Sequence, residues 1–196
     1  MSSNGLRRNP RSAAGIGLAA LALGLTALGG GQAVAAPQDG AETPSLLTVF
    51  KKNALAATSD PFIITNNSGK CLEITSSSTA NGADAQQWTC KGQAGAVWRF
   101  KSTSDGFVNI VNENSKKCLE ITSSSTANGA DAQQWTCKGQ AGAKWKVALI
   151  RTSDGKERLL FVNHSGKVLE ITGSSTANGA NAQQWEYKGQ ASAKWY

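Results

Sequence analysis

The sequence contains a single histidine in 196 residues, and this scarcity bears on catalysis. His164 stands in the stretch F-V-N-H-S-G, whose Asn, Ser and Gly residues are typical of a turn. No residue that could form a catalytic pair with it is evident. We therefore expect that the protein is not an enzyme and that His164 is a turn residue.

Metal-binding patterns are also missing. The four cysteines include no C-x-x-C pair, and no group of acidic residues has the spacing of metal ligands. We expect no metal and no other cofactor, and any ligand binding should be independent of calcium.

Long apolar runs are absent except near the N-terminus, where Ala13–Leu28 is rich in Ala and Leu. Three arginines precede this run and A-V-A follows it at Ala33–Ala35, an order typical of a secretory signal peptide. A membrane anchor is less favoured because the run is short, rich in Gly and Ala, and ends in three glycines. We expect residues 1–35 to be a signal peptide cleaved after Ala35. The mature chain would then be secreted, extracellular and without a membrane span.

Basic residues are few once that segment is set aside. Its removal takes away three arginines and no acidic residue, so the formal net charge falls from +7 to about +4. The basic pairs Lys51-Lys52 and Lys116-Lys117 are the longest Lys/Arg runs that remain. Nucleic-acid binding needs a concentrated basic face, and none is indicated here.

What the sequence has in abundance is internal repetition. Lys70–Ala96 and Lys117–Ala143 are the same 27-residue string, and Lys167–Ala193 repeats it with six changes. Matching positions are 47 residues apart between the first two copies and 50 apart between the second and third. A period in this range indicates one supersecondary unit used several times.

Each copy predicts short β-strands between turns rich in Gly, Asn and Ser. The strands expected in the first copy are Phe62–Thr65, Cys71–Thr75, Ala85–Cys90 and Val97–Lys101. Three such units cannot each bury a core alone, so we expect an all-β domain that closes around a pseudo-threefold axis. We expect this domain to be a monomer.

The domain is expected to span residues 58–196, with repeats at about 60–105, 106–154 and 155–196. Residues 36–57 would form a leader. Because the third copy ends just after its last Trp, Leu47–Ala57 is also predicted to supply a closing strand against the C-terminus.

The cysteines predict two disulfides. Cys71 and Cys90 are 19 residues apart, as are Cys118 and Cys137, and in the third copy both positions change together, to Val168 and Tyr187. Their joint loss favours pairing within each repeat over a shared metal site. Closing a loop of this length stabilises a protein by roughly 3 kcal/mol in the chain-entropy model.

The repeated unit resembles the ricin-type β-trefoil lectin repeat, which also occurs in xylan-binding modules of secreted bacterial enzymes. The resemblance rests on S-G-K-C-L-E-I (Ser68–Ile74), on S-T-A-N-G-A (Ser78–Ala83), on the A-Q-x-W-x-C strand and on the closing Trp, and it covers essentially all of Phe62–Tyr196. It implies a β-trefoil with up to three shallow sugar pockets. The resemblance also implies a galactose-like or xylan-like ligand, because these are the usual ligands of that family.

An acid, a Gln and a Trp recur in the same order in each copy, which suits the hydroxyls and the apolar face of a sugar. Carried over from the family, the acid accepts hydroxyls, the Gln orients the acid and the Trp stacks on the sugar, while a Lys stands where the family usually has a sugar-binding Asn. The candidate site residues are Glu73, Gln86, Trp88, Lys91, Glu120, Gln133, Trp135, Lys138, Glu170, Gln183, Trp185 and Lys188.

The chain departs from the family pattern in having Glu for Asp, Lys for Asn and A-x-W for the closing Q-x-W. Either the lysine binds an acidic or differently oriented sugar, or it pairs with the glutamate and fills the pocket itself. Two further alternatives are open: Trp88, Trp135 and Trp185 pack structurally instead of stacking, and Glu73, Glu120 and Glu170 are merely solvated. The closing tryptophans Trp98, Trp145 and Trp195 are expected in the core.

Among function classes, the sequence favours a secreted carbohydrate-binding lectin. A secreted β-trefoil that binds a protein, such as a protease inhibitor, is the alternative, followed by a structural or cell-surface protein. Near-identical copies favour the lectin, because several weak pockets acting on one polymer gain avidity.

Overall fold

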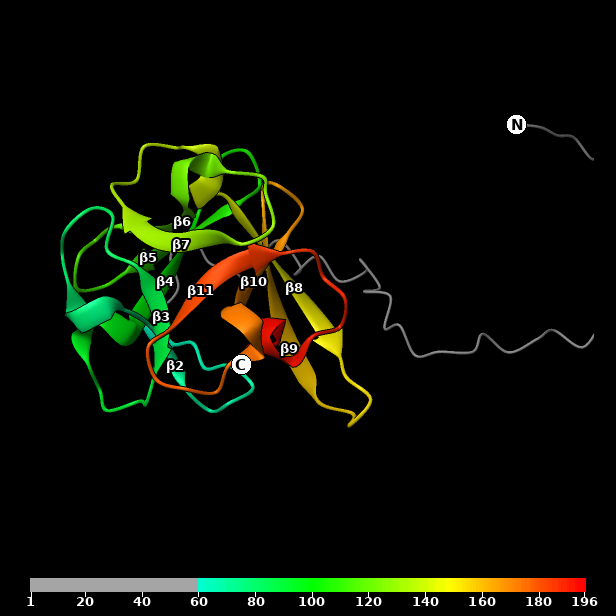
Figure 1. Cartoon of the computed structure of the whole chain (residues 1–196). Coiled ribbons are helices and arrows are strands. Elements are labelled where there is room, and N and C mark those ends of the chain that lie inside the picture. Colours follow the sequence, from blue (N-terminus) through cyan, green and yellow to red (C-terminus); the bar gives the residue numbers. More distant parts are fainter. Residues whose placement is uncertain (1–59) are drawn as a thin grey trace, which may run out of the picture. The chain divides into compact units, whose positions relative to one another are not determined.

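The computed structural model describes residues 60–196 (Figure 1). The predicted signal peptide at residues 1–35, the leader at 36–57 and the proposed closing strand at Leu47–Ala57 lie outside the described residues. Within the described part, no helix is both long and apolar enough to cross a membrane.

The described part consists of strands and single turns of 3-10 helix. The strands are β1 (Phe62–Ile63), β2 (Cys71–Ile74), β3 (Ala85–Trp88), β4 (Val97–Ser102), β5 (Val108–Asn112), β6 (Cys118–Ile121), β7 (Ala130–Trp135), β8 (Trp145–Arg151), β9 (Glu157–Asn163), β10 (Val168–Ile171) and β11 (Ala180–Trp185). The 3-10 turns are η1 (Thr75–Ser77), η2 (Ala94–Ala96), η3 (Thr122–Ser124), η4 (Ala141–Ala143), η5 (Thr172–Ser174) and η6 (Ala191–Ala193). The all-β prediction is confirmed, and the strands expected in the first copy lie where predicted to within two residues at each end.

The strands close into a barrel. Antiparallel pairing runs from β5 through β6, β7, β11, β10, β9 and β8, and β8 pairs again with β5. The strands β3, β7 and β11, one from each copy, lie next to one another in the middle of Figure 1, because β11 pairs with both of the others. Matching parts of the three copies are thereby brought to the same end of the barrel.

Each copy contributes the same hairpin to this barrel. In β2–β3 the side chains of Leu72 and Ile74 point into the core, and Glu73 lies on the opposite face, across from Gln86. This is the period of two expected of a strand. The hairpins β6–β7 and β10–β11 have the same register. The core therefore receives equivalent apolar residues from all three copies.

The closing tryptophans are core residues, as predicted. Trp98, Trp145 and Trp195 are fully buried. Each indole Nε1 donates a hydrogen bond of 2.8–3.0 Å to the backbone carbonyl of a Leu of its own copy, which lies in β2, β6 or β10. The indole thus fills the core and also satisfies a buried carbonyl oxygen.

The chain closes at its C-terminus on the first copy. Trp195 pairs with Asn66 and with Leu159, and the backbone N–H of Tyr196 donates to the carbonyl of Thr65 at 2.8 Å. Among the described residues, the partners of the C-terminal residues thus include the segment just after β1.

The two predicted disulfides are present. Cys71 is bonded to Cys90 and Cys118 to Cys137, with Cα–Cα distances of 5.3 and 5.2 Å. In the third copy, Val168 is buried together with Ile150 and Leu160, and Tyr187 packs against this cluster. Apolar packing therefore occupies the place of the third disulfide.

Glu113, just after β5, makes the protein's stability sensitive to acid. Arg99 and Lys116 both donate hydrogen bonds to its carboxylate, and these bonds, that of Arg99 foremost, lower the pKa of Glu113 below its ordinary value. A carboxyl with a lowered folded-state pKa stabilises the fold above its unfolded pKa of about 4.3, and this contribution is lost as the pH falls through the folded pKa.

We expect Glu113→Gln to lower the free energy of unfolding at neutral pH and to have a smaller effect at about pH 2, because the contribution of the charged carboxylate is lost as the pH falls below the unfolded pKa and towards the lowered folded pKa. Urea unfolding of both proteins at the two pH values measures this. An equal loss at both would mean that the carboxylate charge contributes nothing.

Candidate functional site

The acid of each copy is buried rather than solvated, and the acids of the first two copies lie in the lining of a pocket. Glu73 lies in the middle of β2 and is 5 % exposed, although strand alternation places it on the face away from the core. Gln86, directly across the hairpin in β3, donates its Nε2–H to Glu73 Oε1 at 2.9 Å. The equivalent pairs Glu120–Gln133 and Glu170–Gln183 have the same bond at 3.0 and 2.9 Å. The prediction that the Gln orients the acid is consistent with these bonds.

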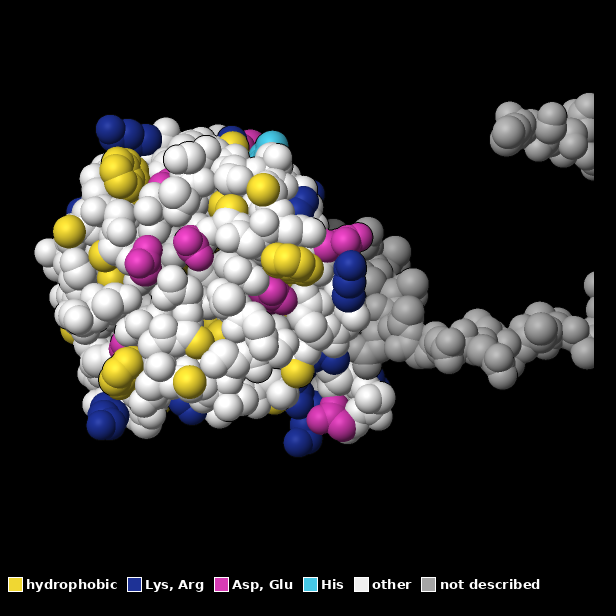
Figure 2. Space-filling model, in the orientation of Figure 1, with side chains coloured by type: hydrophobic (Ala, Val, Ile, Leu, Met, Phe, Trp, Pro, Cys, Tyr) yellow, Lys and Arg dark blue, Asp and Glu magenta, His cyan; other side chains and the backbone are white. Residues whose placement is uncertain are grey.

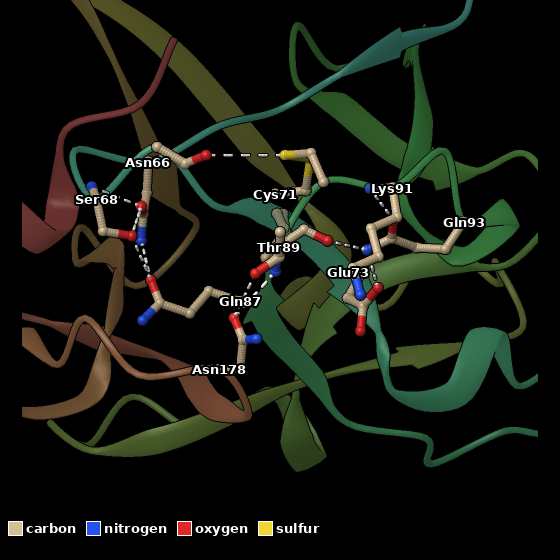
Figure 3. Close-up of a disulfide and its surroundings, with 12 residues drawn as sticks. Asn66, Ser68, Cys71, Glu73, Gln87, Thr89, Lys91, Gln93 and Asn178 are labelled. Carbon is tan, nitrogen blue, oxygen red and sulfur yellow. Dashed lines mark hydrogen bonds between the residues drawn. A yellow bond between two sulfur atoms is a disulfide. The ribbon is translucent and has the colours of Figure 1, made fainter.

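A second glutamine, which sequence reasoning did not single out, holds the other carboxylate oxygen. Gln93 Nε2 donates to Glu73 Oε2 at 2.5 Å and to the carbonyl of Thr89 at 3.1 Å, while its Oε1 accepts from the backbone N–H of Lys91 at 2.7 Å (Figure 3). Gln140 and Gln190 make the same bonds in the other copies. The recurrence of K-G-Q after each hairpin was the available sequence signal.

Trp88 and Trp135 each line a pocket, and Trp185 ends the equivalent strand in the third copy. Trp88 ends β3 on the same face as Gln86 and is 38 % exposed, and Trp135 and Trp185 are 38 and 37 % exposed. One side of each indole is covered by a loop of a different copy. Gly82, at φ +80°, lies so close that an added Cβ would be 3.6 Å from Cζ3 of Trp135. More than one-third of each Trp remains exposed, so part of it is available for stacking.

The S-S-T-A-N-G loop of each copy is hydrogen-bonded to the hairpin of another copy. The fully buried Gln134 donates its Nε2 hydrogens to the carbonyls of Ser78 and Ala80 at 2.8 Å, and Asn81 Oδ1 accepts from the backbone N–H of Thr136 at 3.0 Å. The same bonds join the second copy to the third through Gln184 and the third to the first through Gln87. Figure 3 shows Asn178 of the third copy reaching Thr89 of the first. The loop of each copy is thus fixed against the hairpin of a neighbouring copy, whereas the residues that line each of the two described pockets come from one copy.

The structure brings the four predicted residue types together in two described pockets. Glu73, Gln86, Trp88 and Lys91 line one of about 330 Å³, to which Gln93 also contributes. The second pocket, of about 270 Å³, is lined by the equivalent residues, including Glu120, Gln133, Trp135, Lys138 and Gln140. In the third copy, Glu170, Gln183 and Gln190 have the same hydrogen bonds, and Trp185 and Lys188 are exposed.

The lysines do not fill the pockets by pairing with the floor glutamates. Within residues 60–196, neither Lys91 nor Lys138 forms an ion pair, and Lys188 is 3.5 Å from Glu186 rather than bound to Glu170. Figure 2 shows that Lys and Arg side chains on the face drawn lie apart from one another and toward its edge. That face carries no concentrated basic patch of the kind that nucleic acid needs.

His164, the single histidine of the sequence, does not line either described pocket. His164 is exposed in a turn, and its ring centroid lies 5.7 Å from that of Phe107. No group of three or more His, Cys, Asp or Glu residues in the part described is arranged to hold a metal ion.

A family model supports the resemblance noted in the repeats. The model described as ricin-type beta-trefoil lectin domain-like matches residues 56–135 and 96–185, which together span most of the barrel. No curated protein matches the sequence.

Solved structures resemble the chain over about 70 % of its length. A designed three-fold symmetric protein, ThreeFoil, is 31 % identical with a TM-score of 0.63, and the match covers 69 % of this chain and 95 % of that one. An exo-beta-1,3-galactanase from Clostridium thermocellum is 29 % identical with a TM-score of 0.63, over 70 % of this chain and 29 % of the enzyme.

A ricin B-like lectin of Macrolepiota procera, solved in complex with lactose, is 16 % identical with a TM-score of 0.56, over 71 % of this chain and 95 % of the lectin. At this identity the likeness concerns the fold alone. The all-β barrel is therefore of the kind found in trefoil proteins.

Proposed function

The chain belongs to the ricin-type beta-trefoil lectin domain-like family, and on that premise we propose that it is a secreted lectin without catalytic activity. It would bind a galactose-like or xylan-like polysaccharide or glycan, reversibly and without calcium, as a monomer. The three copies would be related by a pseudo-threefold axis, with one shallow pocket in each. A protein-binding trefoil is not favoured.

The observation that carries this proposal is the composition of the pockets. Each combines a buried carboxylate, which accepts hydrogen bonds from two amides, with a Trp that is more than one-third exposed. The carboxylate has acceptor lone pairs left for sugar hydroxyls, and the indole offers an apolar surface to the C–H face of a sugar ring. A volume of about 270–330 Å³ suits one saccharide unit rather than a large ligand.

Two observations support the proposal that the protein is secreted. The N-terminal pattern is typical of a signal peptide. The two disulfides belong to an oxidising compartment, in which such bonds persist. The mature chain would act outside the cell.

We expect the purified protein to bind glycans on an array and in pull-downs with insoluble polysaccharides, and a variant with Trp88→Ala, Trp135→Ala and Trp185→Ala to lose that binding. Truncation removes the stacking surface of every pocket but leaves the floor and the core tryptophans in place. Circular dichroism verifies that the variant is folded, and EDTA should change nothing. A folded variant that binds as the wild type does would exclude stacking, and a wild type that binds no glycan would overturn the lectin proposal.

A further inference from the structure

In each copy the backbone N–H of the lysine is hydrogen-bonded to a glutamine, and in two copies the lysine ammonium group forms no ion pair among the described residues. The backbone N–H of Lys91 donates to Gln93 Oε1, and Gln93 also holds Glu73, so the root of the lysine is tied to the pocket floor (Figure 3). Lys91 lines the pocket and is exposed, and no carboxylate in the described part lies within ion-pair distance of its ammonium group. Lys138 is in the same situation in the second copy.

The floor of the pocket has the opposite charge. Both oxygens of Glu73 accept hydrogen bonds from neutral amides, so no cation compensates this carboxylate. An anionic group directed at the floor would be repelled by it. Sugar hydroxyls can donate hydrogen bonds to the floor carboxylate, and an anionic substituent of the sugar can pair with the lysine ammonium group at the rim.

The third copy departs from the other two at six positions, and one of these places a carboxylate beside the lysine. Thr89 and Thr136 are replaced by Glu186, whose Oε2 lies 3.5 Å from the ammonium of Lys188. The backbone of Glu186 is held as that of Thr136 is, because each N–H donates at 3.0 Å to an Asn Oδ1 of the neighbouring copy. The third copy therefore carries an added carboxylate at this position and keeps the backbone hydrogen bond.

From these contacts we propose that the first two pockets bind an acidic saccharide. The floor glutamate accepts its hydroxyls, and Lys91 or Lys138 binds its carboxylate or sulfate ester. The third pocket, where Glu186 compensates Lys188, prefers a neutral sugar. This specificity rests on the proposed lectin function and names the ligand class within it.

The test compares acidic and neutral probes of related backbone, measured by titration calorimetry. Glucuronoxylan and neutral arabinoxylan oligosaccharides form one pair, and carrageenan and agarose oligosaccharides form the other. We expect the wild type to bind the acidic member of at least one pair roughly threefold to fivefold more tightly, the scale of an exposed ion pair. This preference should shrink in high salt, which screens exposed charges. The pair that shows it identifies the anionic group as a uronate or a sulfate.

The matched variants exchange the residue types found at one equivalent position, which is Thr in the first two copies and Glu in the third. A variant with Thr89→Glu and Thr136→Glu should lose the preference but still bind neutral sugars, and Glu186→Thr should increase the preference. Lys101→Glu, on β4 and outside the lining of both described pockets, lowers the net charge by the same two units as the double variant and should keep the preference.

Three results would count against the specificity. These are equal binding of acidic and neutral probes by the wild type, an unchanged preference in the Thr→Glu variant, and the same loss in Lys101→Glu, which would reduce the effect to net charge. In each case neutral sugars still bind and the lectin function stands. Failure of every probe to bind would instead overturn the lectin function itself.

Discussion

Trp145→Ala is expected to lower the free energy of unfolding by about 3–5 kcal/mol, the range for truncating a buried aromatic side chain. The Trp145 indole is fully buried at the start of β8, and its Nε1 donates to the carbonyl of Leu119 at 2.9 Å. The substitution removes a large apolar surface, leaves a cavity and deprives a buried carbonyl of its donor. Urea unfolding followed by fluorescence or circular dichroism gives the value.

Trp135→Ala is the matched control, because this Trp belongs to the same copy but is 38 % exposed at a pocket rim. We expect it to cost about 1 kcal/mol of stability, typical of a single substitution, while removing a binding surface. Trp145→Phe retains most of the buried ring but not the N–H donor and should fall between the two. Equal losses for Trp145→Ala and Trp135→Ala would show that the closing Trp does not support the core.

Removal of the second disulfide is expected to cost roughly 3 kcal/mol, since Cys118 and Cys137 close a loop of 19 residues. In the variant with Cys118→Ser and Cys137→Ser the unfolded chain regains the freedom that the cross-link removed. The first disulfide, between Cys71 and Cys90, stays in place as an internal reference. The midpoint of urea unfolding without reductant measures the loss.

The third copy provides the comparison for this experiment. A variant with Cys118→Val and Cys137→Tyr carries the pair that the third copy has at Val168 and Tyr187, which packs with Ile150 and Leu160. It should recover part of the loss, because apolar packing returns but the cross-link does not. If both variants unfolded at the wild-type midpoint, the disulfide would contribute nothing to stability.

The strands and their inward faces were predictable because they depend on local pattern. Leu72 and Ile74 alternate with Cys71 and Glu73, and such alternation assigns two faces whatever the rest of the chain does. The disulfide pairing was predictable for another reason, since the third copy changes both partners together. The core role of Trp98, Trp145 and Trp195 followed from their identical place in each copy.

The environment of the acid was not predictable in this way. Alternation places Glu73 on the face away from the core, which suggests solvent, whereas the structure covers it with Gln86 and Gln93. Gln93 is 20 residues further along the chain, and only the path of the loop after β3 brings it back. The same holds for the loop containing Gly82, which lies against Trp135 of the next copy.

By itself, then, the sequence determined the repeated unit, its strands, its disulfides and the residue types of the candidate pocket, because these depend on spacing within about thirty residues, the scale of a supersecondary unit. The tertiary structure alone decided which residues meet. It buried the glutamates next to Gln86 and Gln93 and their equivalents, and it placed the loop containing Gly82 against Trp135 of the next copy. Such burial depends on contacts between segments that are separated in the chain, and the folding of the barrel, rather than local preference, creates those contacts.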